Sequence, residues 1–254
     1  MRGYLIPDMD IVDLKEFYAS RLGLSTRKLI AGRLTAKMSG LAGATVLGIG
    51  YALPYLEDSV SDLNARIAFM MARRGVIRWP PEGPVASALV DEYDLPLLES
   101  SVDIVLAVHA LELSETPAEM LNEAWRVLAP QGRLLLVVPN RRGIWARFDN
   151  SPFGHGQPFS RPQLSSLLRG SQFSIVSWSH AMFFPPVDNA MALSIAAGVE
   201  RMGARLMPAV SGVVIVEAVK QVYAIAGGKR ARRPSPRFRP ALAPVPSQRS
   251  NSLK

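Results

Sequence analysis

Three polar side chains are candidates for acid–base or hydrogen-bonding chemistry: His109, Asn140 and His155. An unperturbed imidazole has a pKa of about 6.5, so His155 could remove a proton from an acceptor as a general base, or it could order its own loop. Asn140 follows Pro139 at the end of an apolar run, where its amide could hydrogen-bond an acceptor or form a turn. His109 ends another apolar run, where it could line a ligand pocket or be a buried, hydrogen-bonded side chain.

Metal and thiol chemistry are not expected in this chain. It has no cysteine, which removes thiolate ligands, cysteine nucleophiles and disulfides together. The three histidines, His109, His155 and His180, are far apart in the sequence and show no metal-site spacing. We therefore expect no metal centre.

A glycine-rich turn is the next candidate feature. Residues 45–49 form a short β-type run that leads into the segment GIGYA at residues 48–52. Glycine would let the backbone approach a ligand, although a tight turn alone would also use glycine. Asp91 opens an acidic cluster after a second apolar run at residues 85–90, where it could contact a ligand or cap a strand end.

The strongest local pattern is a βαβ unit in the middle of the chain. Residues 103–108 form a near-continuous apolar run, which is typical of a parallel strand buried on both faces. Thr116 is the predicted N-cap of a helix over residues 117–128, with Glu119 completing a capping box. The run at residues 133–138 indicates the next strand, so a right-handed crossover is expected.

The remaining elements complete an α/β pattern. Helices are predicted at residues 13–33, 160–168 and 191–202, and further strands at residues 65–71, 85–90, 173–178 and 213–224. Gly23 is expected to divide the first helix and Ser160 to cap the second. The loop at residues 141–159 is rich in arginine and aromatic residues, so it could recognise an anionic or aromatic partner or form a plain surface lid. An open, mostly parallel sheet binds ligands at the carboxyl ends of its strands, which indicates a nucleotide-like cofactor.

The net charge of +8 is concentrated at one end of the chain. Residues 227–254 hold eight basic residues and no acid, so removing these eight from the 29 Lys and Arg leaves 21 against 21 Asp and Glu. Rich in proline and poor in large apolar residues, this segment is predicted to be disordered. Its charge could attract nucleic acid or an anionic lipid surface, or it could have no partner.

A cytoplasmic protein without a transmembrane helix is expected. The first residues include acids and a proline before any apolar run that could serve as a signal segment. The apolar stretch at residues 207–226 is interrupted by Glu217, Lys220 and Gln221, which makes it a poor membrane span.

Several motifs occur in an order and at a spacing that resemble a known family. They are DEYDLP at residues 91–96, SVDIV at 101–105, EAWRVLAPQGRL at 123–134, and His155 with Phe159-Ser160 before a helix. These segments resemble the class I S-adenosylmethionine-dependent methyltransferases, in particular the type 11 methyltransferase domain, over about residues 45–173. The resemblance implies an α/β, Rossmann-like fold with a mostly parallel sheet flanked by helices.

The same resemblance implies that S-adenosylmethionine is the cofactor. Carried over position by position, it implies a cofactor site made of Gly48, Gly50, Tyr51, Ala52, Asp91, Leu95 and His109. Asn140 and His155 would face the acceptor as catalytic residues, and Arg126 would be structural. The chain then divides into an N-terminal helical segment at residues 1–40, a methyltransferase-like domain at 41–226 and a basic tail at 227–254.

The sequence departs from the family pattern around the cofactor loop. Gly48 stands where the family has an acid, and Ala52 and Pro54 replace two glycines. The second strand ends in residues 69–73 without the acid that would bind ribose hydroxyls. Two hypotheses stay open: a methyltransferase with an unidentified, small-molecule acceptor, and an inactive pseudo-methyltransferase that serves as a binding or regulatory module with a partner protein.

Overall fold

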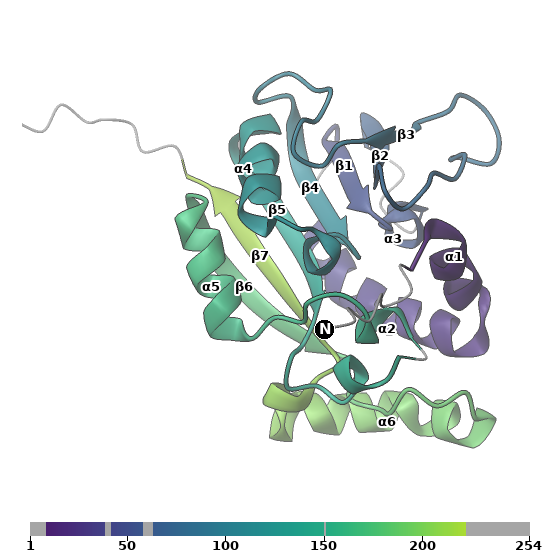
Figure 1. The fold of residues 1–254 in the computed structure, drawn as a ribbon. Coiled ribbons are helices and arrows are strands. Elements are labelled where there is room, and N and C mark those ends of the chain that lie inside the picture. The colour runs from purple at the N-terminus through teal and green to yellow at the C-terminus, as the bar shows by residue number, and fades with distance from the viewer. Residues whose placement is uncertain (1–8, 39–41, 58–62, 150, 222–254) are drawn as a thin grey trace, which may run out of the picture. The chain divides into compact units, whose positions relative to one another are not determined.

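The computed structural model describes residues 9–38, 42–57, 63–149 and 151–221. Their centre is a seven-stranded sheet with the order β3-β2-β1-β4-β5-β7-β6 (Figure 1). The strands are β1 (Thr45–Gly50), β2 (Ala65–Met71), β3 (Ser87–Val90), β4 (Val102–Val108), β5 (Leu128–Pro139), β6 (Phe173–Ala181) and β7 (Val213–Lys220). The apolar run predicted as a central strand is β4, which lies in the middle of the sheet, so that prediction is confirmed.

Six of the seven strands run in the same direction. The first five pair in parallel, whereas β7 lies antiparallel between β5 and β6. Pro139 of β5 and Ala181 of β6 both pair with Val213, so β5 and β6 end at the same side of the sheet. We call the side where β1 to β6 end the carboxyl edge. The predicted mostly parallel sheet is confirmed.

Helices cover both faces of the sheet, and each face has its own apolar core. The helices are α1 (Ile11–Ala19), α2 (Arg21–Met38), α3 (Leu53–Glu57), α4 (Pro117–Val127), α5 (Arg161–Gly170) and α6 (Ala190–Leu206). The side chains of α1, α2, α3 and α6 pack in one core, which includes Val46 of β1, and those of α4 and α5 in the other, which includes Leu47. Successive residues of a strand point to opposite faces, which explains why both cores draw on every central strand.

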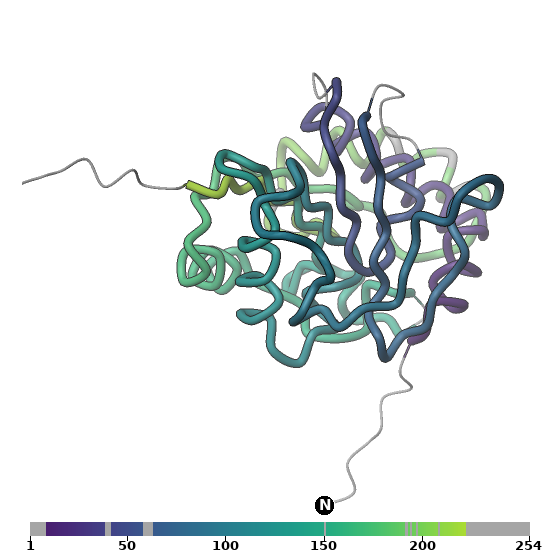
Figure 2. The backbone as a smooth tube through the Cα atoms, turned by 90° about the horizontal axis from the view of Figure 1, so that it is seen from above, coloured from purple at the N-terminus to yellow at the C-terminus, as the bar shows by residue number. Residues whose placement is uncertain are grey.

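The N-terminal helix begins against the connection that follows β2 (Figure 2). Ile11 N–H donates to Arg74 O at 2.8 Å, and Arg74 Nη1 donates to Met9 O at 3.3 Å. The described residues all fall within one compact unit, Met1–Val222. The boundary between residues 1–40 and 41–226 stays a prediction.

The predicted division of the first helix at Gly23 is wrong. The break lies at Ser20, whose N–H and hydroxyl both donate to Phe17 O, at 3.0 and 2.7 Å. Gly23 lies inside α2, where a Cβ would stand 1.9 Å from Phe17 O. Glycine is therefore needed there because the start of α2 packs against the end of α1, and not because the helix ends.

The two predicted helix caps have different outcomes. At α5, Ser160 Oγ accepts from Gln163 N–H at 3.4 Å and Gln163 Oε1 accepts from Ser160 N–H at 3.0 Å, so the cap at Ser160 is confirmed as a capping box. At α4, the Thr116 side chain accepts no hydrogen bond from a described backbone N–H, and its hydroxyl donates to Glu119 Oε2 at 3.3 Å. The capping box predicted there is wrong, because a ψ of 74° at Thr116 departs from the extended backbone of an N-cap.

The predicted basic tail, residues 227–254, lies outside the described residues. Among the helices that the structure does describe, none combines the length and apolarity required to cross a membrane.

Candidate functional site

The glycine turn after β1 is built around the end of β4. Gly50 has a φ of +77°, and a Cβ on it would lie 2.4 Å from Val108 O. The next N–H, that of Tyr51, donates to the same carbonyl at 2.7 Å. Gly48 serves a different contact, because a Cβ there would lie 2.8 Å from both Ala52 Cβ and Leu56 Cδ1. Both glycines are thus required by packing at the carboxyl edge.

Four polar side chains meet beneath this turn, and we call them the buried polar cluster: Tyr18, Tyr55, His109 and Glu112. His109 Nε2 lies 3.0 Å from Tyr18 Oη, and Tyr55 Oη donates to Tyr18 Oη at 3.1 Å. His109 Nδ1 lies 3.3 Å from Glu112 Oε1. His109 and Glu112 are each 2% exposed, and His109 has a φ of +48°, a strained conformation of the kind that gathers at functional sites.

The hydrogen bonds in the cluster indicate which group donates to which. With Tyr55 donating to Tyr18, the Tyr18 hydroxyl proton is free for His109 Nε2, and His109 Nδ1–H then faces Glu112. Burial, followed by Tyr55, raises the pKa of Tyr18 well above its usual range. Burial also raises the pKa of the neighbouring Tyr51 to about 12. These tyrosines are neutral hydroxyl donors at physiological pH.

Glu112 is the unsatisfied member of the cluster. Neither of its carboxylate oxygens makes a hydrogen bond within the described part of the chain, and His109 Nδ1 lies beside it at 3.3 Å. A carboxylate withdrawn from water costs several kcal/mol unless donors surround it. Such a group in a native fold points to a donor that a ligand supplies.

A cavity of about 270 Å³ lies at the ends of β2 and β3, and Leu113, which follows Glu112 in the chain, is among its lining residues. Its lining includes Met71, Arg73, Asp91, Tyr93, Leu113 and Glu115, and we call it the strand-edge cavity. Asp91 is exposed there, and its Oδ1 accepts from Tyr93 N–H at 2.9 Å. Arg73 forms an ion pair with Glu115, which brings an acid to the place where β2 itself supplies none. Drug-sized ligands need about 300–1,000 Å³, so this cavity fits one part of such a ligand.

Leu95 takes a place in the apolar core and not in the cavity lining. Its side chain is buried, and its carbonyl accepts from Arg126 Nη2 at 2.9 Å. Arg126 also donates to Leu97 O at 2.8 Å and pairs with Glu123, so Arg126 is structural, as predicted.

Asn140 uses its amide to tie the end of β5 to the segment before β7. Its Nδ2 donates to Ser211 O at 2.9 Å and Ala209 O at 3.0 Å, and its Oδ1 accepts from Arg142 N–H at 3.2 Å. These bonds favour the turn-forming alternative. A direct contact of Asn140 with an acceptor stays a prediction.

His155 lies in the loop after β5, apart from the buried polar cluster. Its Nε2 is 3.0 Å from Asp149 O, a contact that orders the loop. The same loop sends Trp145 into the core, where its Nε1–H donates to Phe184 O at 2.6 Å. Trp145 is therefore not available for stacking on a partner, and a catalytic role for His155 stays a prediction.

The structure thus joins His109 to three residues that the sequence alone did not single out. Tyr18 sits in the apolar stripe of α1 and Tyr55 in α3, where an aromatic side chain predicts only burial. Glu112 offered one signal, since it follows His109 by three positions in an otherwise apolar stretch.

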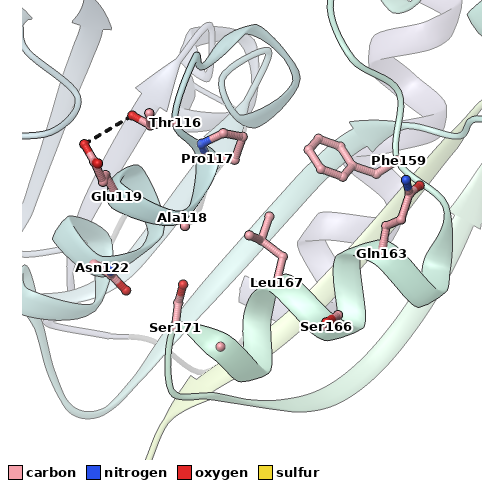
Figure 3. Close-up of a pocket in the computed structure, with 11 residues that line it drawn as sticks. Thr116, Pro117, Ala118, Glu119, Asn122, Phe159, Gln163, Ser166, Leu167 and Ser171 are labelled. Atoms are coloured by element: carbon pink, nitrogen blue, oxygen red, sulfur yellow. Dashed lines mark hydrogen bonds between the residues drawn. The ribbon is translucent and has the colours of Figure 1, made fainter.

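A larger hollow lies between α4 and α5. It measures about 740 Å³, and Figure 3 shows Phe159 and Leu167 between the two helices. Its polar groups are side chains of the helix surfaces, and it contains neither a histidine nor a buried acid. The chemistry at the carboxyl edge makes the smaller cavity the better candidate site.

Part of the chain is similar to a known protein family. Residues 32–136 match the family described as Methyltransferase domain. A curated relative from Mycolicibacterium smegmatis, described as a probable S-adenosylmethionine-dependent methyltransferase, is 28% identical over 141 residues. The match covers 53% of this chain and 53% of the relative, so the chain spans about half the length of the curated relative it matches.

Solved structures of methyltransferases share the fold. An S-adenosylmethionine-dependent methyltransferase from Thermotoga maritima, named as a possible histamine N-methyltransferase, gives a TM-score of 0.55 at 15% identity, over 83% of this chain and 96% of that one. Geranyl diphosphate C-methyltransferase from Streptomyces coelicolor gives 0.53 at 13% identity, over 81% and 83%. The predicted Rossmann-like methyltransferase fold is confirmed, and similarity at this level of identity concerns the fold alone.

Proposed function

Because residues 32–136 belong to the methyltransferase domain family and the sheet has the class I methyltransferase fold, we propose that this chain is an S-adenosylmethionine-dependent methyltransferase. Its acceptor, by this proposal, is a small molecule whose identity is open. The observation that carries the proposal is the buried Glu112 carboxylate, which has no hydrogen bond among the described residues and precedes Leu113, a residue that lines a cavity at the carboxyl edge.

The residues present fit the cofactor. In the strand-edge cavity, Met71 and Leu113 would cover the apolar faces of the adenosine, while Asp91 and Glu115 would accept from its amino and hydroxyl groups. Glu112 would accept from the ammonium of the amino acid part. These assignments replace the two acids missing at Gly48 and at the end of β2 with acids from other segments.

S-adenosylmethionine supplies an electrophilic methyl group on a positively charged sulfur. The contribution of the chain would be to bind and orient the reactants and to exclude water, and orientation alone can supply a large share of rate acceleration. Tyr18, neutral and held between Tyr55 and His109, would keep His109 Nδ1–H directed at Glu112. Asn140 and His155 stay candidates for contact with the acceptor.

The inactive pseudo-methyltransferase is the less supported alternative. It rested on the missing acids, and Glu112 and Glu115 offer carboxylates at the same edge of the sheet. The relatives that the chain resembles are described as methyltransferases, which favours an enzyme. Under this alternative, the site would bind a partner protein or an altered ligand.

Isothermal titration with S-adenosylmethionine and S-adenosylhomocysteine tests the proposal. Saturable binding of both, followed by release of labelled S-adenosylhomocysteine when acceptor candidates are added, supports an enzyme. Binding without turnover on any acceptor class would favour the inactive alternative. Absence of binding at millimolar concentration would reject the methyltransferase proposal.

A further inference from the structure

A second pocket opens at the carboxyl edge, where β5 and β6 end beside α5 (Figure 1). It measures about 290 Å³ and shares no lining residue with the strand-edge cavity. Its lining includes Asn140, Arg142, Ser160, Arg161 and His180, and we call it the basic pocket. The pocket collects side chains from three segments: the loop after β5, the first turn of α5 and the end of β6.

Positive charge dominates the basic pocket. Arg142 and Arg161 come from different segments, and no acid is among the residues that line it. Neither arginine forms an ion pair with a carboxylate in the described part of the chain. The guanidinium carbon of Arg161 lies 4.8 Å from the centroid of the Trp178 ring, a stacking contact that orients its donors.

Hydrogen bonds connect Asn140, Ser211 and His180. Asn140 Nδ2 donates to Ser211 Oγ at 3.2 Å, and Ser211 Oγ lies 3.0 Å from His180 Nδ1. The Ser211 hydroxyl has one proton, which it can donate to Nδ1. A neutral His180 then carries its proton on Nε2, which has no hydrogen-bond partner among the described residues. His180 therefore presents a donor to the pocket in both protonation states.

The electrostatics of His180 agree with a site that lacks its counter-ion. Burial lowers the pKa of His180, and the positive charges of Arg161 and Arg33 lower it further. No carboxylate contributes an opposing effect. Arg33 pairs with Glu200 at 3.8 Å, whereas Arg161 has no carboxylate partner among the described residues.

We infer that the basic pocket binds the carboxylate or phosphate group of a small molecule. A guanidinium offers two parallel N–H donors that match the two oxygens of such a group, and His180 Nε2–H adds a third direction. The volume suits one small anionic molecule or one end of a larger one. This inference does not depend on the proposed methyl transfer. In the basic pocket, Asn140 is a positioning residue, because it acts on His180 through Ser211.

Histidine NMR on the full chain tests the inference, because the sequence has only three histidines and His180→Gln identifies the signal. Inorganic phosphate and acetate are titrated separately, with chloride holding the ionic strength constant. A bound anion favours the imidazolium, so the pKa of His180 should rise by about one unit or more in a saturable way. The signals of His109 and His155 should show no such saturation.

Two charge-matched variants make the result specific. Arg161→Gln should weaken anion binding by about tenfold or more, as the loss of a charge-assisted pair predicts. Arg169→Gln removes the same charge from the exposed last turn of α5 and should leave binding unchanged. The inference is overturned if neither anion gives a saturable shift, or if both variants behave alike. A response to phosphate but not acetate, or the reverse, assigns the group.

Discussion

Replacing Glu112 by glutamine tests the assignment at the core of the proposed site. The change keeps the shape of the side chain and removes one negative charge from a position that is 2% exposed. Among the described residues, this charge has only His109 Nδ1, at 3.3 Å, to offset its loss of hydration. A neutral amide avoids much of that cost. We therefore expect the free energy of unfolding of Glu112→Gln to equal or exceed that of the unmodified protein.

Cofactor binding should respond in the opposite direction. A hydrogen bond between an ammonium and a buried carboxylate is worth about 1.5–3 kcal/mol, because both partners are charged and water is excluded. At roughly 1.4 kcal/mol per tenfold in Kd, losing it should weaken S-adenosylmethionine about tenfold to a hundredfold. The ligand 5′-methylthioadenosine has the nucleoside but no amino acid part, so its affinity should not change.

Calorimetry with both ligands, together with urea unfolding of the ligand-free protein, provides the assay. Glu82→Gln is the matched control, because Glu82 is exposed and lies outside the lining of the site. An equal loss of affinity for both ligands would refute the assigned contact between Glu112 and the ammonium. An unchanged affinity for S-adenosylmethionine would refute it as well. A lower free energy of unfolding for Glu112→Gln would show that the Glu112 carboxylate stabilises the fold and is not kept for contact with a ligand.

Three further predictions concern the frame of the site. Gly50→Ala should lower the free energy of unfolding by about 2 kcal/mol or more, because φ is +77° and the new Cβ would lie 2.4 Å from Val108 O. The control Gly32→Ala, in the middle of α2 where a Cβ has no close neighbour, should not lower it. Urea unfolding measures both variants. Ser160→Ala should cost about 1 kcal/mol by the same measurement, because it removes the capping box of α5. Burial raises the pKa of Glu200, so the folded state holds this proton more tightly than the unfolded state, and the contribution to stability is lost as pH rises. The unfolding free energy of Glu200→Gln minus that of the unmodified protein should therefore grow from acidic to neutral pH. A difference that is independent of pH would contradict this prediction.

Strands could be predicted well from the sequence because their signal is local. The apolar run that forms β4 is buried on both faces, and the run at residues 65–71 has the bounds of β2. The helix break was misplaced because glycine has two uses that look identical in a sequence. Gly23 permits close packing inside α2, and the chain turns instead at Ser20 through its own hydrogen bonds to Phe17 O.

The site could be predicted only in part, because its decisive contacts are between residues distant in the chain. His109 was identified by its place after a strand, but its partner Tyr18 lies 91 positions away and arrives through the packing of α1. A tyrosine in an apolar stripe gives no sign of its hydrogen bond. Likewise, the missing acid after β2 was visible in the sequence, whereas the nearby Glu115 depends on the ion pair with Arg73.

The crystal structure of this chain with S-adenosylhomocysteine is the most direct test of the central claim. The proposal predicts the adenosine in the strand-edge cavity, against Asp91 and Leu113, and the ammonium within hydrogen-bond distance of Glu112. Density for the ligand elsewhere, or an ammonium paired with a different carboxylate while Glu112 stays without a donor, would contradict it.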